Sequence, residues 1–298
     1  MNLKAQWVYL RSEAYPDGVI LKKGKVRISP DDRGFLFADG AYEVIRSYSG
    51  KLFLPEKHIA RFRHSLDALR IPFSDTASMA GIIRELAVRN DLEHSDALVY
   101  VQVTRGTWPR ILGFPATPLI PTVYVEVSRF VPPTNEMAHG IAAITVPDSR
   151  WTRCDIKWLG LLPNVLARQQ ATEAGAAEAI FVREGLVTEG SHSTIFGVIR
   201  GTVVTHPLDH NVLPGITREI VLKLCSRLGV QVSETPIPET RVLDLDEMFL
   251  ACTTGEVTPI IRVNGQRIGN GQPGLVTRRL QEAFRAYVAD VLALPNSH

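Results

Sequence analysis

The chain has 298 residues, of which 45% are hydrophobic and 21% are charged, a composition typical of a globular protein with a sizeable core in one large or two ordinary domains. Its 33 lysine and arginine residues against 31 aspartate and glutamate residues give a net charge of +2, so charge provides no general argument for a nucleic-acid or membrane partner. No stretch approaches the roughly 18 apolar residues of a membrane span, and no apolar signal segment is expected near Met1. Three widely spaced cysteines favour reduced thiols in a cytoplasmic protein.

The first part of the chain predicts strands, then helices, then strands again. Residues 40–48 alternate in the manner of a strand. Pro55 suits the first turn of a helix, whose apolar residues recur at helical spacing: Ile59, Phe62, Leu66 and Leu69. Further β-branched strands are expected at 97–104 and 122–127. This order favours an α+β layer over a doubly wound sheet.

A break in the pattern follows at the adjacent residues Pro132 and Pro133, because neither a helix interior nor a central strand accommodates two prolines. The expected division is a small N-terminal domain over residues 1–128, a linker over 129–136 and a larger C-terminal domain over 137–298. In the larger domain the pattern predicts short strands at 179–182, 194–198 and 248–252, and helices at 161–174, 216–228 and 277–292.

Lys157 stands in an apolar run, between Ile156 and Trp158. The ordinary interpretation of such a lysine is a packed stem with its ammonium group in water. The alternative is a nucleophile, because apolar surroundings disfavour the ammonium form and a neutral amine can form a Schiff base with an aldehyde cofactor. Glu189, about thirty residues later, is a carboxylate that could pair with a pyridinium nitrogen, although a lone glutamate after a strand is usually a surface residue.

Both residues lie in longer motifs. Residues 150–164, RWTRCDIKWLGLLPN, match nearly residue for residue the lysine motif of the fold-type IV pyridoxal-phosphate (PLP) transaminases, and the D-amino-acid transaminases most closely. Residues 188–196, TEGSHSTIF, resemble the family's T-E-G-S-x-S-N-x-F loop. The resemblance implies that Lys157 holds PLP as a Schiff base and moves the substrate's α-proton, and that Glu189 keeps the pyridine nitrogen protonated.

The resemblance also implies a phosphate cup. Residues 213–218, LPGITR, match one family phosphate loop at the start of a helix, and residues 252–259, CTTGEVTP, match a second. The sequence HIAR at 58–61 matches the family's arginine fork. Without the resemblance, a helix cap and a surface arginine explain these segments equally well. The implied contacts to the cofactor ring and phosphate are Arg61, Leu213, Ile216, Thr217, Thr253 and Thr254.

For the substrate, the resemblance points to Tyr42 in DGAYEV and to Arg110 in TRGTWPR, and in the family this arginine comes from the neighbouring subunit. An arginine holds a carboxylate through two hydrogen bonds. Leu112 stands where the family has a histidine, which removes one donor from the carboxylate clamp. Arg105 is a second candidate, for which a structural role in the loop is favoured.

The resemblance implies a two-domain α+β fold of the fold-type IV class, with PLP in the cleft between the domains of a cytoplasmic homodimer. The expected activity is ping-pong transamination from a D-amino acid to a 2-keto acid, with no metal, nucleic acid or membrane involved. Two alternatives share the scaffold, a branched-chain L-amino-acid transaminase and an (R)-amine transaminase. A PLP lyase of the aminodeoxychorismate lyase type is a further alternative, and a PLP-binding protein with an idle site is the non-enzymatic one.

Overall fold

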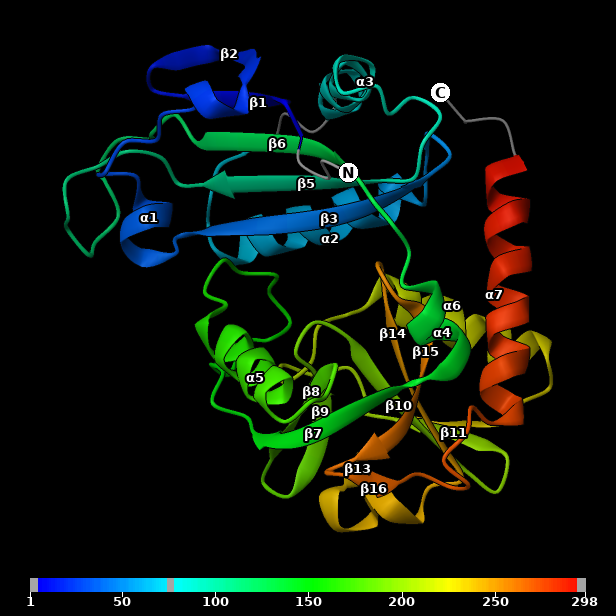
Figure 1. Cartoon of the computed structure of the whole chain (residues 1–298). Helices are drawn as coiled ribbons and strands as arrows, with labels where there is room; N and C mark the ends of the chain where they lie inside the picture. Colours follow the sequence, from blue (N-terminus) through cyan, green and yellow to red (C-terminus); the bar gives the residue numbers. More distant parts are fainter. Residues whose placement is uncertain (1–4, 74–77, 294–298) are drawn as a thin grey trace. The chain divides into compact units, whose positions relative to one another are not determined.

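The computed structural model describes residues 5–73 and 78–293. The chain forms two compact units (Figure 1). Unit 1 consists of the chain up to Val131 together with the short segment Ile156–Gly160, and unit 2 consists of Pro132–Asp155 and the chain from Leu161 onward. The segment that carries Lys157 therefore belongs to unit 1.

Unit 1 is an antiparallel sheet in the order β2-β1-β6-β5-β3-β4. The strands are β1 (Trp7–Ser12), β2 (Tyr15–Lys22), β3 (Gly40–Tyr48), β4 (Lys51–Leu52), β5 (Ala97–Thr104) and β6 (Thr122–Arg129). The helices of unit 1 are the short η1 (Lys23–Lys25) and α1 (Arg33–Phe37), and the longer α2 (Pro55–Ala68) and α3 (Met79–Arg89).

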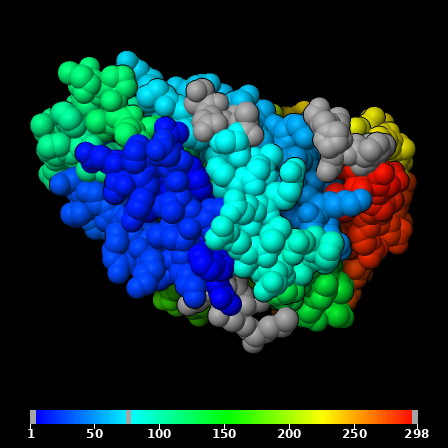
Figure 2. Space-filling model, turned by 90° about the horizontal axis from the view of Figure 1, so that it is seen from above, coloured from blue at the N-terminus to red at the C-terminus, as the bar shows by residue number. Residues whose placement is uncertain are grey.

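The core of unit 1 follows from alternation along its central strands. Val99 and Val101 of β5 are buried opposite Val127 and Val125 of β6, so one face of the sheet is apolar. Helices α2 and α3 bury their apolar stripes in the same cluster. Helix α3 also contacts β1, and Figure 2 shows the cyan surface of α3 beside the blue surface of the first two strands.

Unit 2 contains a mixed sheet in the order β12-β11-β10-β14-β15-β7-β8-β9-β13, with β16 paired to β15. The strands are β7 (Ile141–Pro147), β8 (Glu178–Arg183), β9 (Leu186–Gly190), β10 (Thr194–Ile199), β11 (Thr202–Thr205), β12 (Val232–Ser233), β13 (Ile237–Pro238), β14 (Glu247–Cys252), β15 (Glu256–Val263) and β16 (Gln266–Arg267). The helices are α4 (Thr134–His139), α5 (Leu162–Glu173), α6 (Ile216–Arg227), η2 (Glu239–Asp244) and α7 (Leu275–Ala293). Helices α6 and α7 pack against each other and on β14 (Figure 1).

The structure confirms the α+β class and the expected helices, and it adds elements that the sequence pattern did not predict. Strand β2 has no fully buried residue and contains Pro16 and Gly18, so it lacks the apolar alternation that marks a strand. Helix α4 begins at Thr134, inside the expected linker, because Pro133 precedes the helix and costs it no hydrogen bond. The domain boundaries at 128 and 136 stay a prediction. Among the described residues, no helix combines the length and the apolar composition that a membrane crossing needs.

Candidate active site

The backbone of Lys157 is fixed at the edge of β3. The Tyr42 amide donates to the Lys157 carbonyl at 3.1 Å, and the Leu159 amide donates to the Gly40 carbonyl at 3.1 Å. The Lys157 amide donates to the hydroxyl of Ser65 on α2 at 3.0 Å. Since β4 pairs only with the far end of β3, this edge is open to the lysine segment. The backbone is therefore held at the amide and the carbonyl of Lys157, and again at the amide of Leu159.

Gly40 permits this close approach. A Cβ atom at Gly40 would lie 2.5 Å from the Val103 carbonyl oxygen and 2.6 Å from a methyl group of Leu159. Both distances are shorter than real Cβ contacts, so any larger residue would clash with the backbone of β5 and with the Leu159 side chain of the lysine segment.

The structure brings Lys157 and Tyr42 together. The half-buried lysine places its Nζ 4.4 Å from the centroid of the Tyr42 ring. Tyr42 lies 5.8 Å from the ring of Tyr100 on β5, which limits the freedom of the Tyr42 ring. A tyrosine from β3 therefore lies beside the amine that the sequence singled out.

Arg61 is held by a buried carboxylate that the sequence did not single out. Glu43 of β3 accepts hydrogen bonds from Arg61 Nε at 2.9 Å and from Arg61 Nη2 at 2.7 Å. His58 Nδ1 lies 3.1 Å from the same carboxylate. Burial opposes ionisation of Glu43, but Arg61 and His58 outweigh it, and the pKa of Glu43 lies far below its usual range. The guanidinium orientation is therefore set by a carboxylate from the strand that also pairs with the Lys157 segment.

Arg105 has a structural role. Its guanidinium donates to both carboxylate oxygens of Asp39, at 2.8 Å and 2.9 Å, and to the carbonyls of Leu69 and Arg70. Asp39 also accepts from Arg33 at 2.7 Å. The buried Arg105 side chain therefore links the end of β5 to the C-terminal end of α2. This is the structural role that the sequence favoured.

Arg110 lies on the loop that these residues brace. Arg33 donates to the carbonyl of Ile111 at 2.6 Å and to that of Leu112 at 3.3 Å. The Arg110 side chain is exposed, with its guanidinium carbon 5.5 Å from the centroid of the Phe37 ring. Within unit 1 the loop is therefore fixed while Arg110 itself points into solvent.

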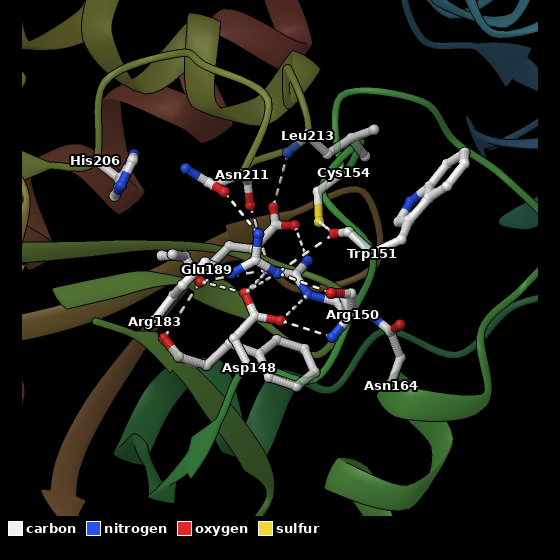
Figure 3. Close-up of polar contacts among 12 residues, drawn as sticks. Asp148, Arg150, Trp151, Cys154, Asn164, Arg183, Glu189, His206, Asn211 and Leu213 are labelled. Carbon is white, nitrogen blue, oxygen red and sulfur yellow. Dashed lines mark hydrogen bonds and ion pairs between the residues drawn. The ribbon is translucent and has the colours of Figure 1, made fainter. Parts of the chain in front are cut away.

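In unit 2, Glu189 is buried at the end of β9 and has a partner on each oxygen (Figure 3). Arg150 donates to Oε1, and the Leu213 amide donates to Oε2 at 3.0 Å. Burial raises the pKa of Glu189, and the Arg150 guanidinium and the Leu213 amide oppose that rise. The carboxylate is therefore held in one orientation next to the residue expected to pack on the cofactor ring.

Arg150 was quoted in the lysine motif, but its role is evident only from the fold. Its guanidinium bridges Glu189 and Asp148, donating to the Asp148 carboxylate at 2.9 Å and 2.8 Å. Burial opposes ionisation of Asp148, yet its bonds to Arg150 hold the pKa below the usual range. Arg183 adds a second cation, 3.2 Å from Asp148. The sequence shows only the place of this arginine, seven residues before the lysine, and its buried partners follow from the fold.

The expected phosphate loops lie in unit 2. Helix α6 begins at Ile216 after Gly215, and Thr217 is buried in its first turn. A Cβ at Gly215 would lie 2.9 Å from the Thr194 hydroxyl, so glycine keeps the backbone close to β10. Thr253 and Thr254 form the turn between β14 and β15. Amides of a helix start together with threonine hydroxyls are the donors that a phosphate takes, so this set fits the phosphate of PLP. No group of three potential metal-ligating side chains occurs among the residues described.

Unit 1 presents an anchored lysine beside a tyrosine. Unit 2 presents a buried carboxylate and a helix start of the kind that suits an anion. The family model "Amino-transferase class IV" matches residues 40–263. The chain belongs to this family.

Individual relatives agree with the family match. A D-alanine aminotransferase from Bacillus licheniformis is 40% identical over 270 residues, covering 90% of this chain and 94% of that protein. A D-alanine aminotransferase from Staphylococcus haemolyticus is 35% identical over 278 residues, covering 93% and 98%. The crystal structure of a branched-chain amino acid aminotransferase from Escherichia coli superposes with a TM-score of 0.87 at 24% identity, covering 99% of this chain and 98% of that one. The predicted fold-type IV class and PLP-dependent aminotransferase activity are confirmed.

Proposed function

We propose that this aminotransferase moves the amino group of a D-amino acid to a 2-keto acid by a ping-pong mechanism. The two D-alanine aminotransferases support the D-amino-acid assignment, since each aligns with nearly the whole chain. The observation that carries the proposal is the anchored Lys157, whose amine lies beside Tyr42. Amino acids and 2-keto acids are the corresponding substrates.

Lys157 is the proposed catalytic residue. When bound, PLP supplies an electron sink for the charge left on the substrate's α-carbon. The Lys157 amine would hold the cofactor covalently, and as a free amine it would move the substrate's α-proton. Glu189 holds a proton on the pyridine nitrogen, and its fixed orientation between Arg150 and the Leu213 amide supports that role.

The remaining cofactor contacts are proposed from the donors that each unit presents. Arg61 contributes a guanidinium oriented by Glu43, and α6 contributes amides at its start. Leu213 would pack against the cofactor ring. The proposed phosphate contacts are Arg61, Ile216, Thr217, Thr253 and Thr254.

Tyr42 and Arg110 are the proposed contacts for the substrate carboxylate. A carboxylate suits the guanidinium of Arg110, which is exposed on the loop braced by Arg33. We propose that Arg110 acts on the neighbouring subunit of a homodimer. A cytoplasmic location is supported by Cys154, Cys225 and Cys252, which are all free thiols.

The central test is covalent trapping of the cofactor on Lys157. The protein incubated with PLP and reduced with borohydride should gain one phosphopyridoxyl group on the peptide that contains Lys157, as read by peptide mass spectrometry. Lys157→Ala should gain none and should lose the half-reaction with amino donors. Trapping at another lysine in the wild-type protein would overturn the assignment.

The preferred donor separates the proposed activity from its alternatives. Single-turnover absorbance changes with D-alanine should exceed those with L-leucine and (R)-1-phenylethylamine by at least about tenfold in rate. A faster reaction with L-leucine would establish the branched-chain alternative, which the fold of the Escherichia coli enzyme also accommodates. Release of pyruvate from aminodeoxychorismate would establish the lyase.

A further inference from the structure

Glu189 lies in a β-bulge of strand β9. Val187 pairs with Val182 of β8 and Gly190 pairs with Ile180, so β9 has one residue more than β8 between these two pairs. A bulge interrupts the ladder and turns the side chains within it, and such bulges are common beside active sites. Regular strand pairing therefore does not fix the direction of the Glu189 carboxylate, and the contacts that close the bulge acquire this role.

The turn after the bulge, residues 190–193, is held by Glu178, the first residue of β8. Its Oε1 atom accepts hydrogen bonds from the Ser191 amide at 3.0 Å and from the Ser191 hydroxyl at 2.5 Å, and its Oε2 atom accepts one from the Ser193 hydroxyl at 2.8 Å. The Glu178 side chain is fully buried, so water does not compete for these bonds. The two serines of the motif at 188–196 thus share one carboxylate, a role that the sequence did not assign to them.

Further contacts fix the shape of this turn. The Gly190 amide donates to the Ser193 carbonyl at 2.7 Å, and the side-chain amide of Asn164 on α5 donates to the Ser191 carbonyl at 2.8 Å. A Cβ atom at Gly190 would lie 2.2 Å from the Ser193 hydroxyl oxygen and 3.1 Å from the Glu178 carboxylate. Glycine therefore lets the carboxylate approach the chain directly after the bulge.

The charge of Glu178 is balanced mainly by these neutral donors. The two basic side chains beside it, His192 with Nδ1 at 3.3 Å and Arg168 with a guanidinium nitrogen at 3.7 Å, are half-exposed. Ion pairs open to solvent contribute little, whereas a buried donor that loses its acceptor is costly. Loss of the carboxylate would leave the buried donors of Ser191 and Ser193 without their acceptor, so the destabilisation would fall on this turn.

We propose that Glu178 is a positioning residue for Glu189. By holding the 190–193 turn, it closes the bulge and keeps the Glu189 carboxylate between Arg150 and the Leu213 amide (Figure 3). The inference rests on the proposed function, in which Glu189 keeps a proton on the pyridine nitrogen. A displaced Glu189 would protonate the ring less fully, so removal of the substrate's α-proton would slow while covalent attachment of PLP to the lysine would persist.

Hydrogen exchange of the purified protein tests the positioning itself, without added cofactor or substrate. Glu178→Ala should speed amide exchange in a peptide covering residues 187–193 by at least about tenfold, because the turn loses its acceptor. The matched control is Glu247→Ala, since Glu247 is also the first residue of a strand and accepts hydrogen bonds from the Val276 and Thr277 amides and the Thr277 hydroxyl. This control should leave exchange at 187–193 unchanged. Wild-type protection of 187–193 in Glu178→Ala would overturn the proposal.

Milder variants keep the test decisive. Glu178→Gln retains an oxygen acceptor for Ser191 and should give an exchange rate between those of wild type and Glu178→Ala. Ser193→Ala removes a single donor and should also speed exchange at 187–193. Unchanged exchange in both variants would contradict the proposal even if Glu178→Ala does not fold.

The bound state supplies the functional readouts. With PLP labelled at its ring nitrogen, nitrogen NMR should show a protonated ring in wild type and Glu247→Ala, and a signal shifted toward the unprotonated ring in Glu178→Ala. Borohydride trapping on Lys157 should be equal in all three proteins, while the half-reaction with D-alanine should slow by at least about tenfold in Glu178→Ala alone. An unchanged ring signal and rate in that variant would limit Glu178 to a role in the fold and end the proposal. Failure of the wild type to bind PLP would refute the proposed function, while hydrogen exchange would still show whether Glu178 holds the bulge.

Discussion

At the scale of single residues, the groups that surround the proposed catalytic side chains are mostly charges brought together over long sequence distances. Glu43 lies on β3 and orients His58 and Arg61 on α2, while Asp148 and Glu189 share Arg150. A buried ion pair contributes little net stability against an apolar replacement, but breaking it by removing one partner is costly. These networks therefore orient the surrounding side chains. Loss of one member leaves a buried charge without its partner and destabilises the fold.

Replacing Glu43 with Gln should show this through pH. The folded pKa of Glu43 lies below the unfolded one, so its ionisation stabilises the fold fully above about pH 5, and that contribution is lost as the pH falls toward the folded value. At pH 7, Glu43→Gln should lower the free energy of unfolding by roughly 3–5 kcal/mol, because the Arg61 charge is left buried without its carboxylate partner. The difference from wild type, measured by urea unfolding, should shrink between pH 5 and pH 3.

Glu85 provides the control. It forms an exposed ion pair with Arg89 one turn along α3, so Glu85→Gln should change stability by less than about 0.5 kcal/mol, with no pH trend. If Glu43→Gln behaved like Glu85→Gln at every pH, the buried network would have no role in the fold.

At the scale of elements, the sequence predicted those with a clear period of their own. Helices α2, α6 and α7 and strand β5 carry apolar stripes that a single sequence displays. Strand β2 has no such stripe, because it lies at a sheet edge where none of its residues is fully buried. The placement of 156–160 on β3 was also unpredictable, because it depends on a bridge between Ala41 and Trp158, more than a hundred residues apart.

Gly40 tests whether that placement matters. Gly40→Ala should strain β3 against the backbone of β5 and displace the Leu159 side chain of the Lys157 segment, lowering the free energy of unfolding by about 1–3 kcal/mol and reducing cofactor trapping on Lys157. Gly81→Ala is the matched control, since a Cβ there meets nothing within 4 Å on helix α3, and it should stabilise the protein by about 0.5–1 kcal/mol. Urea unfolding gives the stabilities and borohydride trapping gives the cofactor. Unimpaired trapping in Gly40→Ala would show that the lysine tolerates a displaced segment.

At the scale of the whole molecule, the sequence motifs pointed to Lys157 and Glu189, whose roles stay a prediction, but not to the residues that hold them. Ser65, Glu43 and Arg150 were not assigned these roles, because a hydroxyl, a carboxylate and a guanidinium acquire them only through tertiary contact. A motif match points to a residue's role without these contacts, where the chain has the family's residues at the family's spacing. It fails where this chain departs from the family, as at His192, whose Nδ1 lies 3.3 Å from the buried carboxylate of Glu178.

The surface of unit 1 around Arg110 bears on assembly. The side chains of Ile111, Leu112 and Phe114 on the same loop are exposed, with Leu112 at 82%, and clustered apolar exposure of this kind marks an interaction surface. An arginine on such a loop is positioned to serve a neighbouring subunit, as the proposed homodimer requires.

Mixing two inactive variants tests whether Arg110 acts across subunits. Lys157→Ala lacks the amine and Arg110→Ala lacks the carboxylate clamp, so each homodimer should be inactive toward D-alanine. In a mixed dimer, one site combines Lys157 of one subunit with Arg110 of the other, so equal co-expression should restore about a quarter of wild-type activity. If Arg110 serves its own subunit, each site of the mixed dimer lacks one group and nothing is recovered. Activity toward an amine without a carboxylate is the internal control. Arg110→Ala alone should retain this activity. The mixture should show only the activity of those sites that contain an intact Lys157.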